Sequence, residues 1–383
     1  MAREFIMPNQ IISGIGALEL AEDTLGKLGK KALIVTDMMM LQLGNCEKLE
    51  QALKNKGVEY VIYSEINGEP TDVMLVDGIS LFKKESCDFL VALGGGSPID
   101  AMKAIAAMID RDDKISSYMG KEIVGKLPSM VAIPTTAGTG SEVTQFTIIS
   151  DTEKGVKMLL RGKVLMPNVA IIDPQFTMTA PPKITAATGL DALCHAVEAY
   201  TSKKSQKMSD TFAISAVKRI LEYLPIVYKE GNNEAAREQM SLAALEAGVA
   251  FNNSSVTLIH GMSRPIGALF HIAHGLSNAM LIKVCLNFAL PGAYEKFAEL
   301  GRSVKVASVT DSDEVAGRKF LDKVEELVVM LEAPTLEEYG VNKEEFSSMI
   351  SKMASDAMIS GSPQNTQREI TQSDIEELYK ELW

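Results

Sequence analysis

The sequence is poor in features that several protein classes require. Only four cysteines occur in 383 residues, with no CxxC pair, so we expect reduced thiols and no disulfides. No apolar run approaches the roughly 18 residues that a membrane span needs. Glu4 and Pro8 stand where a signal peptide would have its apolar stretch. These absences predict a cytoplasmic protein with no membrane partner.

Positive charge is also scarce. The formal net charge of -12 argues against a polyanion, so nucleic acid is excluded as the main partner. The composition, 46% hydrophobic and 23% charged, is that of an ordinary globular protein. A chain of this length exceeds what one hydrophobic core usually organises, so we expect two domains with a cleft between them.

The first part of the chain has the pattern of an α/β domain. Short apolar runs alternate with helical patterns up to about residue 175, in KKALIVTD, VEYVIYSE, DFLVALGGGS and LPSMVAIPTT. This alternation predicts a parallel sheet with covering helices. The segments VTQFTIIS, DTEKG and VKMLL predict a hairpin appended to that sheet, beside its last parallel strand.

The second part has a different character. After TAPPKITAAT, strands vanish and long helical periodicities take over, as in DALCHAVEAYTS and EAAREQMSLAALEAGVAF. The turn-forming segments DPQF and APPK lie between the two patterns. We therefore predict an α/β domain over residues 1–178 and an all-helical domain over residues 179–383.

A glycine-rich loop follows one of the apolar strands. Gly94, Gly95, Gly96, Ser97 and Asp100 lie between DFLVAL and the helical pattern AMKAIAAMI. Glycines at such a turn let backbone N–H groups approach a phosphate, and the helix N-terminus adds positive potential. The spacing is not GxGxxG, so the alternatives of a plain tight turn and of helix caps stay open.

Two further features favour a dinucleotide. Thr135, Thr136 and Thr139 lie in a second loop after a strand, and loops at the carboxyl ends of parallel strands converge on one ligand site. The alternative is a loop with only local side-chain bonds. Asp37 ends KKALIVTD, where its carboxylate could bind a ribose diol and repel a 2'-phosphate, which favours NAD over NADP. A helix-capping role is the alternative.

The histidines suggest a metal site. All four in the chain fall between residues 195 and 274. Asp191 and His195 are spaced i, i+4 in a predicted helix and so share a face, whereas His260 and His274 could join them only through tertiary folding. Three imidazoles and a carboxylate suit Fe(II) or Zn(II), with room for a substrate oxygen. For any single histidine, an ordinary hydrogen-bonded role is the alternative.

Two neighbours of His195 need separate mention. Cys194 could supply a thiolate ligand, although small buried cysteines commonly only pack. Glu198 is expected to orient a metal ligand from outside the coordination sphere, or to form a surface ion pair, rather than to bind metal itself.

With these residues in hand, the sequence resembles the iron-containing (group III) alcohol dehydrogenase family, nearly end to end. The matching segments are GGGSPID, IPTTAGTGSEVT, ATGLDALCHAVEAYTS, AGVAFNN and HGMSRPIGALFHIAHGLSNAMLI. The resemblance implies a Rossmann-like NAD-binding domain, a helical metal-binding domain, and a homodimer or larger homo-oligomer. It also implies hydride transfer between NAD(H) and a small alcohol, diol or aldehyde.

The resemblance carries roles to individual positions. The metal ligands would be Asp191, His195, His260 and His274, and GGGSPID would be the pyrophosphate loop. Asp37 matches the position linked to NAD preference, and Lys157, in the predicted hairpin, matches a cofactor-contacting lysine. The loop lining the cofactor would contain Thr135, Thr136 and Thr139.

One departure from the family pattern affects proton transfer. Many members have a further histidine four residues after the third ligand, and this chain has Arg264 there. An arginine stays protonated and is a poor proton shuttle. His271 is our candidate for substrate contact or proton relay, with simple packing as the alternative. Arg264 could instead bind an anionic group, which leaves hydroxyacid substrates open.

Three competing hypotheses stay open at this point. One is a lyase resembling dehydroquinate synthase, which also uses NAD and a metal. Another is a transhydrogenase that couples a hydroxyacid to an oxoacid with tightly held nicotinamide. A metal-free ligand-binding relative is the third, and it is weakened because all four ligand positions are filled.

Overall fold

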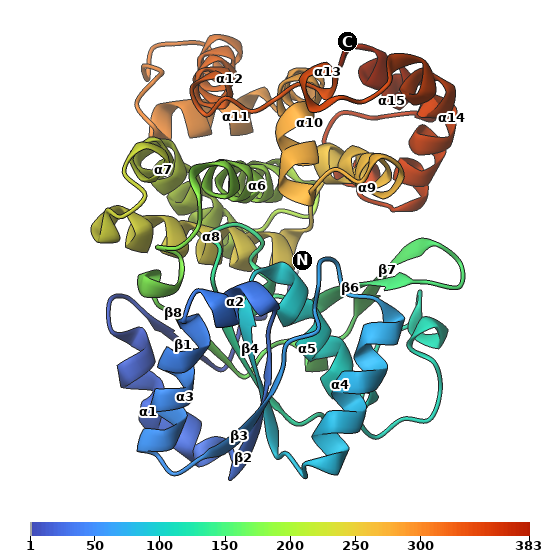
Figure 1. Cartoon of the computed structure of the whole chain (residues 1–383). Helices are drawn as coiled ribbons and strands as arrows, with labels where there is room; N and C mark the ends of the chain where they lie inside the picture. The colour runs from blue at the N-terminus through green and yellow to red at the C-terminus, as the bar shows by residue number, and fades with distance from the viewer. Residues whose placement is uncertain (1) are drawn as a thin grey trace. The chain divides into compact units, whose positions relative to one another are not determined.

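The structure is a computed structural model that describes residues 2–383. The chain forms two compact units (Figure 1). One unit comprises Ile6–Ala180, and the other comprises Pro181–Trp383 together with the N-terminal residues up to Phe5.

The first unit contains a six-stranded sheet in which every neighbouring pair is parallel, in the order β1-β8-β5-β4-β2-β3. Its strands are β1 (Gln10–Ser13), β2 (Lys31–Val35), β3 (Glu59–Tyr63), β4 (Phe89–Gly94), β5 (Ser129–Pro134) and β8 (Val169–Ile172). The α-helices of this unit are α1 (Ala17–Leu28), α2 (Met38–Gln42), α3 (Asn45–Asn55), α4 (Asp72–Lys84) and α5 (Gly96–Met108).

Helices cover both faces of this sheet, which explains why its central strands are continuous apolar runs. On β2, Leu33 and Val35 pack into the cluster that contains the buried residues of α4 and α5. Ala32 and Ile34 point the other way, into the cluster with α1 and α3. All six residues of β4 are buried. The α/β class predicted from the alternating runs is confirmed.

Two strands at one side of the sheet were not predicted. β1 and β8 have only four residues each, and they pair in register from Gln10↔Val169 to Ser13↔Ile172. Because β8 also pairs with β5, the sheet edge that the hairpin was expected to occupy is already filled.

The predicted hairpin exists, but its expected position was wrong. β6 (Phe146–Asp151) and β7 (Val156–Arg161) form a separate two-stranded antiparallel sheet. Alternate residues of β6 are buried, and this strand lies against α5. One face of the hairpin is therefore buried against α5, and the hairpin does not pair with the edge of the six-stranded sheet.

The second unit is helical, as predicted, and contains no named strand within its described residues. Its α-helices are α6 (Pro182–Thr201), α7 (Lys207–Lys229), α8 (Glu234–Ser254), α9 (Leu258–Phe270), α10 (His274–Ala289), α11 (Tyr294–Ser303), α12 (Asp313–Met330), α13 (Leu336–Tyr339), α14 (Lys343–Ile359) and α15 (Gln372–Lys380). A short 3-10 helix, η6 (Pro363–Asn365), follows α14 and packs against α9.

Over residues 2–383, no single helix combines the length and the apolar character that crossing a bilayer would take.

Candidate metal centre and cofactor loops

Helix α6 supplies the first two residues of a buried polar cluster. Asp191 and His195 are one turn apart on this helix and are 2% and 5% exposed. A carboxylate and an imidazole this deeply buried require strong partners, since burial without compensation is costly. The predicted i, i+4 face is therefore turned into the protein.

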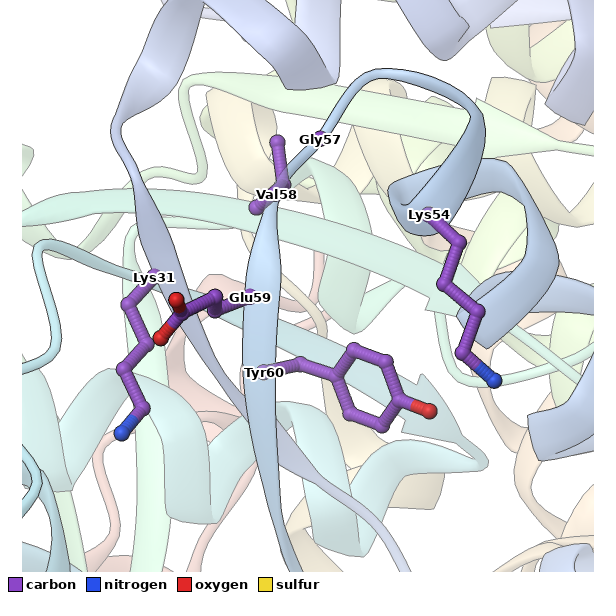
Figure 2. Close-up of a pocket in the computed structure, with 6 residues that line it drawn as sticks. All are labelled: Lys31, Lys54, Gly57, Val58, Glu59 and Tyr60. Atoms are coloured by element: carbon purple, nitrogen blue, oxygen red, sulfur yellow. The ribbon is translucent and has the colours of Figure 1, made fainter.

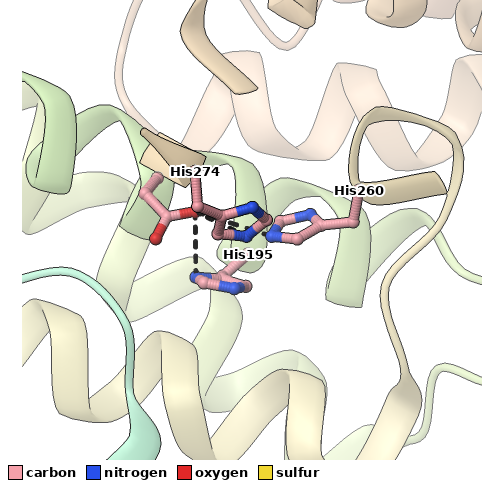
Figure 3. A group of neighbouring side chains, drawn as sticks. His195, His260 and His274 are labelled. Carbon is pink, nitrogen blue, oxygen red and sulfur yellow. Dashed lines mark ion pairs between the residues drawn. The ribbon is translucent and has the colours of Figure 1, made fainter. Parts of the chain in front are cut away.

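His260 and His274 join this pair from two other helices. His260 lies in the first turn of α9, and His274 is the first residue of α10. One ligand atom from each of the four residues lies within 4.8 Å of all the others. Figure 3 shows the three imidazoles gathered around one point, with dashed lines marking their ion pairs. The folded chain thus brings His260 and His274 next to Asp191 and His195, which the sequence alone could not establish.

The spacing of these atoms fits a single metal ion. Asp191 Oδ1 lies 3.8 Å from His195 Nδ1, 3.5 Å from His260 Nε2 and 3.8 Å from His274 Nε2. Ligands about 2.1 Å from a tetrahedral metal lie about 3.4 Å from one another. The donor set, three imidazole nitrogens and one carboxylate oxygen, is one that Fe(II) and Zn(II) both accept. The four residues therefore fit the single metal ion that the sequence predicted.

Glu198 holds His260 in the orientation that metal binding needs. Its Oε1 accepts hydrogen bonds from Thr257 Oγ1 at 2.8 Å and from the Ile259 backbone N–H at 2.6 Å. Its Oε2 contacts His260 Nδ1. With Nδ1–H donated to this carboxylate, His260 Nε2 keeps its lone pair and faces the cluster. Glu198 is 1% exposed, so it acts inside the protein and not in a surface ion pair.

Asn278 belongs to the cluster and was missed in the sequence. Its Nδ2 lies 2.7 Å from Asp191 Oδ1, 3.2 Å from His260 Nε2 and 3.3 Å from His274 Nε2. It follows His274 by four residues on α10, so the i, i+4 rule used for α6 would have found it. Phe251 stacks on His195 with ring centroids 4.2 Å apart and closes the apolar side of the cluster.

The charges in the cluster favour an anionic carboxylate. Burial opposes the ionisation of Asp191, yet the three imidazoles outweigh it and hold the pKa of this carboxyl below its usual value. Burial likewise opposes the charged form of His260, but the carboxylates of Glu198 and Asp191 raise its pKa to about 8. The two carboxylates therefore favour a positive charge among these imidazoles, which a metal ion can supply in place of the proton.

Two other predicted candidates lie outside this group. Cys194 is buried on α6, where burial and the Glu198 charge raise the pKa of its thiol, so it stays a neutral packing residue. His271 is exposed at the C-terminal end of α9 with φ 53°, and it is not among the four mutually close residues. A proton relay through His271 therefore remains a prediction.

The two predicted cofactor loops meet at the carboxyl ends of two neighbouring central strands. β4 and β5 are adjacent and parallel, with Gly94 opposite Pro134, so both loops leave from their carboxyl ends. A side chain at Gly96 would come within 3.1 Å of Thr139. At Gly95 the nearest neighbour would be Thr136, at 3.5 Å. The approach is tight only at Gly96, the first residue of α5, where glycine lets the threonine loop come close to the N-terminus of this helix.

The first loop begins with a sharp turn. A side chain at Gly94 would come within 2.5 Å of Pro98, and Thr135 donates its backbone N–H to the Gly94 carbonyl at 2.9 Å. Ser97 lies in the first turn of α5. Asp100 accepts a hydrogen bond from the Ile148 N–H at 2.9 Å, so this carboxylate ties α5 to β6.

The other two predicted cofactor residues have protein partners. Asp37 caps α2, where its Oδ1 accepts a hydrogen bond from the Met40 N–H at 3.0 Å. The cap uses one of the two carboxylate oxygens. Lys157 lies on β7, and its Nζ contacts Glu69 at 2.7 Å.

A surface pocket elsewhere in the α/β unit contributes nothing to this site. It lies where β2 and β3 begin, and Figure 2 shows its side chains pointing in different directions. Ligands of open parallel sheets bind at the carboxyl ends of strands, and this pocket lies at the amino ends. It is lined by Lys31, Lys54, Gly57, Val58, Glu59 and Tyr60.

Comparison with known proteins gives a consistent result over the whole chain. Residues 8–174 match the iron-containing alcohol dehydrogenase family, and residues 185–383 match the C-terminal region of the Fe-containing alcohol dehydrogenase family. The NAD-dependent methanol dehydrogenase of Bacillus methanolicus is 35% identical over 390 residues, covering 99% of both chains.

Solved structures agree with the sequence comparisons. A 1,3-propanediol oxidoreductase has a TM-score of 0.96 at 32% identity and covers 100% of both chains. A sulfoacetaldehyde reductase from Bifidobacterium kashiwanohense, solved in complex with NAD+, has a TM-score of 0.89 at 28% identity. It covers 100% of this chain and 99% of its own. The chain is therefore an oxidoreductase of the iron-containing alcohol dehydrogenase family.

Proposed function

We propose that this protein is an NAD(H)-dependent alcohol dehydrogenase or aldehyde reductase with one iron ion at the cluster formed by Asp191, His195, His260 and His274. The observation that carries the proposal is the convergence of these four buried side chains from three helices, at spacings that suit one cation. A divalent cation held there supplies Lewis-acid chemistry at an alcohol or carbonyl oxygen, and the nicotinamide takes or gives the hydride.

The residues around the ligands fix the geometry before substrate arrives. Glu198 selects the tautomer of His260 that presents Nε2, and Phe251 excludes water from one face of His195. Asn278 donates from its amide to Asp191 Oδ1 and so restrains that carboxylate. Rigid, hydrogen-bonded ligands of this kind keep one coordination geometry through the reaction, which lowers the reorganisation that catalysis requires.

The α/β unit is proposed to bind the dinucleotide. The N-terminus of α5 and the glycines before it suit the pyrophosphate, and the threonine loop beside them offers hydroxyls to the nicotinamide half. Asp37 is proposed to bind the ribose hydroxyls and to select NAD over NADP. Lys157 is proposed as a further cofactor contact, which would require it to leave Glu69.

Iron is proposed over zinc on the family membership, since the donor set accepts both. We further propose a homodimer or larger homo-oligomer. A cytoplasmic setting is proposed as well, because each of the four cysteines carries a free, buried thiol.

One experiment tests the core of this proposal. The protein is purified anaerobically, its metals are measured by elemental analysis, and NADH oxidation is followed with a panel of aldehydes and ketones. We expect about one iron per chain and aldehyde reduction with equal molar consumption of NADH. A cofactor that is recycled without net NADH consumption would support a lyase or a transhydrogenase instead.

A further inference from the structure

Arg264 is a cationic side chain without an anionic partner. It lies on α9, one turn after His260, so the two side chains leave the same face of the helix. Its one hydrogen bond runs from Nη1 to Ser362 Oγ at 3.0 Å, and no ion pair to Arg264 occurs among residues 2–383. Burial lowers the pKa of the guanidinium. A guanidinium has five N–H donors, so most of its donors have no protein acceptor.

The carboxylate that acts electrostatically on this charge does not pair with it directly. Glu198 interacts electrostatically with Arg264, but both of its oxygens are occupied by Thr257, Ile259 and His260. A partly buried charge that lacks a counter-ion is unfavourable, and such charges usually have a partner. The positive charge of Arg264 is therefore left to be neutralised by an anion that is not part of the protein.

The position of the guanidinium is fixed by the packing of α9 against the segment that follows α14. A side chain at Gly261 would come within 2.6 Å of Pro363, so only glycine lets this segment approach. The approach places Ser362, which is 5% exposed, against Arg264. The serine hydroxyl holds one edge of the planar group, and the opposite donors stay available for the forked hydrogen bonds that oxyanions accept.

We propose that Arg264 is the anion-binding residue of the substrate site, and that the substrates are small aldehydes or alcohols carrying a carboxylate, sulfonate or phosphonate group. This inference rests on the proposed function, because it places the reacting oxygen at the cluster that contains His260. One helical turn, about 6 Å along α9, separates the two positions, so a short-chain molecule spans them. A cationic alcohol such as choline would be repelled.

The test compares charged and neutral substrates of the same size. NADH oxidation is measured with glyoxylate, 4-oxobutanoate, sulfoacetaldehyde and phosphonoacetaldehyde, and with neutral partners such as butanal and methyl 4-oxobutanoate. We expect at least one anionic aldehyde to exceed its neutral partner about tenfold or more in kcat/KM, and the four arms identify which anion is recognised. In Arg264→Gln this ratio should fall about tenfold to about 100-fold, mainly through KM, while neutral aldehydes change little.

Two further variants and one binding measurement complete the design. Arg264→Lys keeps the charge and should retain part of the preference, which also covers the case in which the glutamine variant fails to fold. Arg318→Gln removes an exposed arginine from α12 and should change no ratio. Calorimetry with the NADH-bound enzyme, which cannot turn over an alcohol, should show 4-hydroxybutanoate binding at least about tenfold more tightly than 1-butanol, if 4-oxobutanoate is the preferred aldehyde.

The outcomes separate the two proposals. If no aldehyde is reduced, the proposed function fails. If wild type reduces neutral aldehydes as well as anionic ones, or if Arg264→Gln leaves the charged-to-neutral ratio unchanged, the anion site is overturned while the dehydrogenase stands.

Discussion

Glu198 offers the sharpest test of how the protein prepares its metal ligands, because it touches a ligand without being one. In Glu198→Gln, one of the two carboxylate oxygens becomes an NH2 group. If that group faces His260, two donors meet, and the imidazole must move its proton to Nε2, the atom that faces the cluster. If it faces the other way, it meets the N–H of Ile259 and the hydroxyl of Thr257. Either outcome weakens the site.

The size of the effect follows from comparable sites. Loss of a carboxylate that orients a metal-binding histidine typically lowers metal affinity 10-fold to 100-fold, which is about 1.4 to 2.8 kcal/mol. We expect this loss in Fe(II) and Zn(II) affinity, measured by competition with a chromogenic chelator under anaerobic conditions. Asp191, His195 and His274 remain in the variant, so binding should be weakened and not abolished.

A matched control exists on another helix. Glu246 on α8 also accepts hydrogen bonds from neighbouring side chains, Ser215 and Arg219, but none of its partners is in the cluster. Glu246→Gln should leave metal affinity unchanged. Equal affinities for wild type, Glu198→Gln and Glu246→Gln would refute the orienting role of Glu198.

Three further predictions concern turnover, cofactor choice and pH. His260→Ala should abolish turnover while NADH binding, followed by fluorescence titration, stays largely intact; loss of both would indicate a structural role for this histidine. Asp37→Gly should raise the kcat/KM ratio for NADP(H) over NAD(H) about tenfold to about 100-fold, because a like charge is removed from the 2'-phosphate, and an unchanged ratio would contradict the assignment. Burial raises the pKa of Glu142 from 4.5 to about 7, and its Oε2 is buried without a hydrogen-bond partner. The protonated form is thus favoured by the fold, so this contribution to stability is complete below pH 4.5 and is lost as pH rises through about 7. The free energy of unfolding of Glu142→Gln, relative to that of wild type, should therefore rise by about 2 kcal/mol from pH 5 to pH 8. The measurement is the difference between the two thermal midpoints at each pH. A difference that does not change with pH would contradict the burial argument.

Much of the fold was predictable because its strongest signals are local. β4 and β5 are short apolar runs bounded by glycine or proline, and burial on both faces makes such runs easy to recognise. β1 and β8 were missed because four residues are too few for a pattern to stand out from their surroundings. The hairpin was recognised from its turn, but its packing partner, α5, depends on which strand fills the sheet edge.

The candidate site likewise has one part that local sequence predicts and another that depends on tertiary packing. The pairing of Asp191 with His195 follows from helical spacing alone, whereas the approach of His260 and His274 depends on how α6, α9 and α10 pack. No local pattern encodes that packing. The resemblance to a known family supplied it as an expectation, and the folded chain brings the ligand atoms together.

The residues around the ligands were the hardest to predict. Asn278 carried a usable signal, its spacing from His274, but an asparagine near a histidine is common and was not singled out. For Glu198 the sequence left open a surface ion pair, and only tertiary packing places Thr257 and Ile259 on its carboxylate. Contacts of this kind come from chain segments about 60 residues apart, which periodicity does not relate.

The central claim is that one catalytic cation is held by three imidazoles and one carboxylate, and a metal-exchange experiment tests it most directly. Anaerobically purified protein is stripped with a chelator and reloaded with iron, and metal content and NADH oxidation are measured at each step for wild type and for Asp191→Ala. We predict that wild type loses its activity with about one equivalent of metal and regains both on reloading, and that Asp191→Ala does neither. Full activity in metal-free wild-type protein would contradict the account.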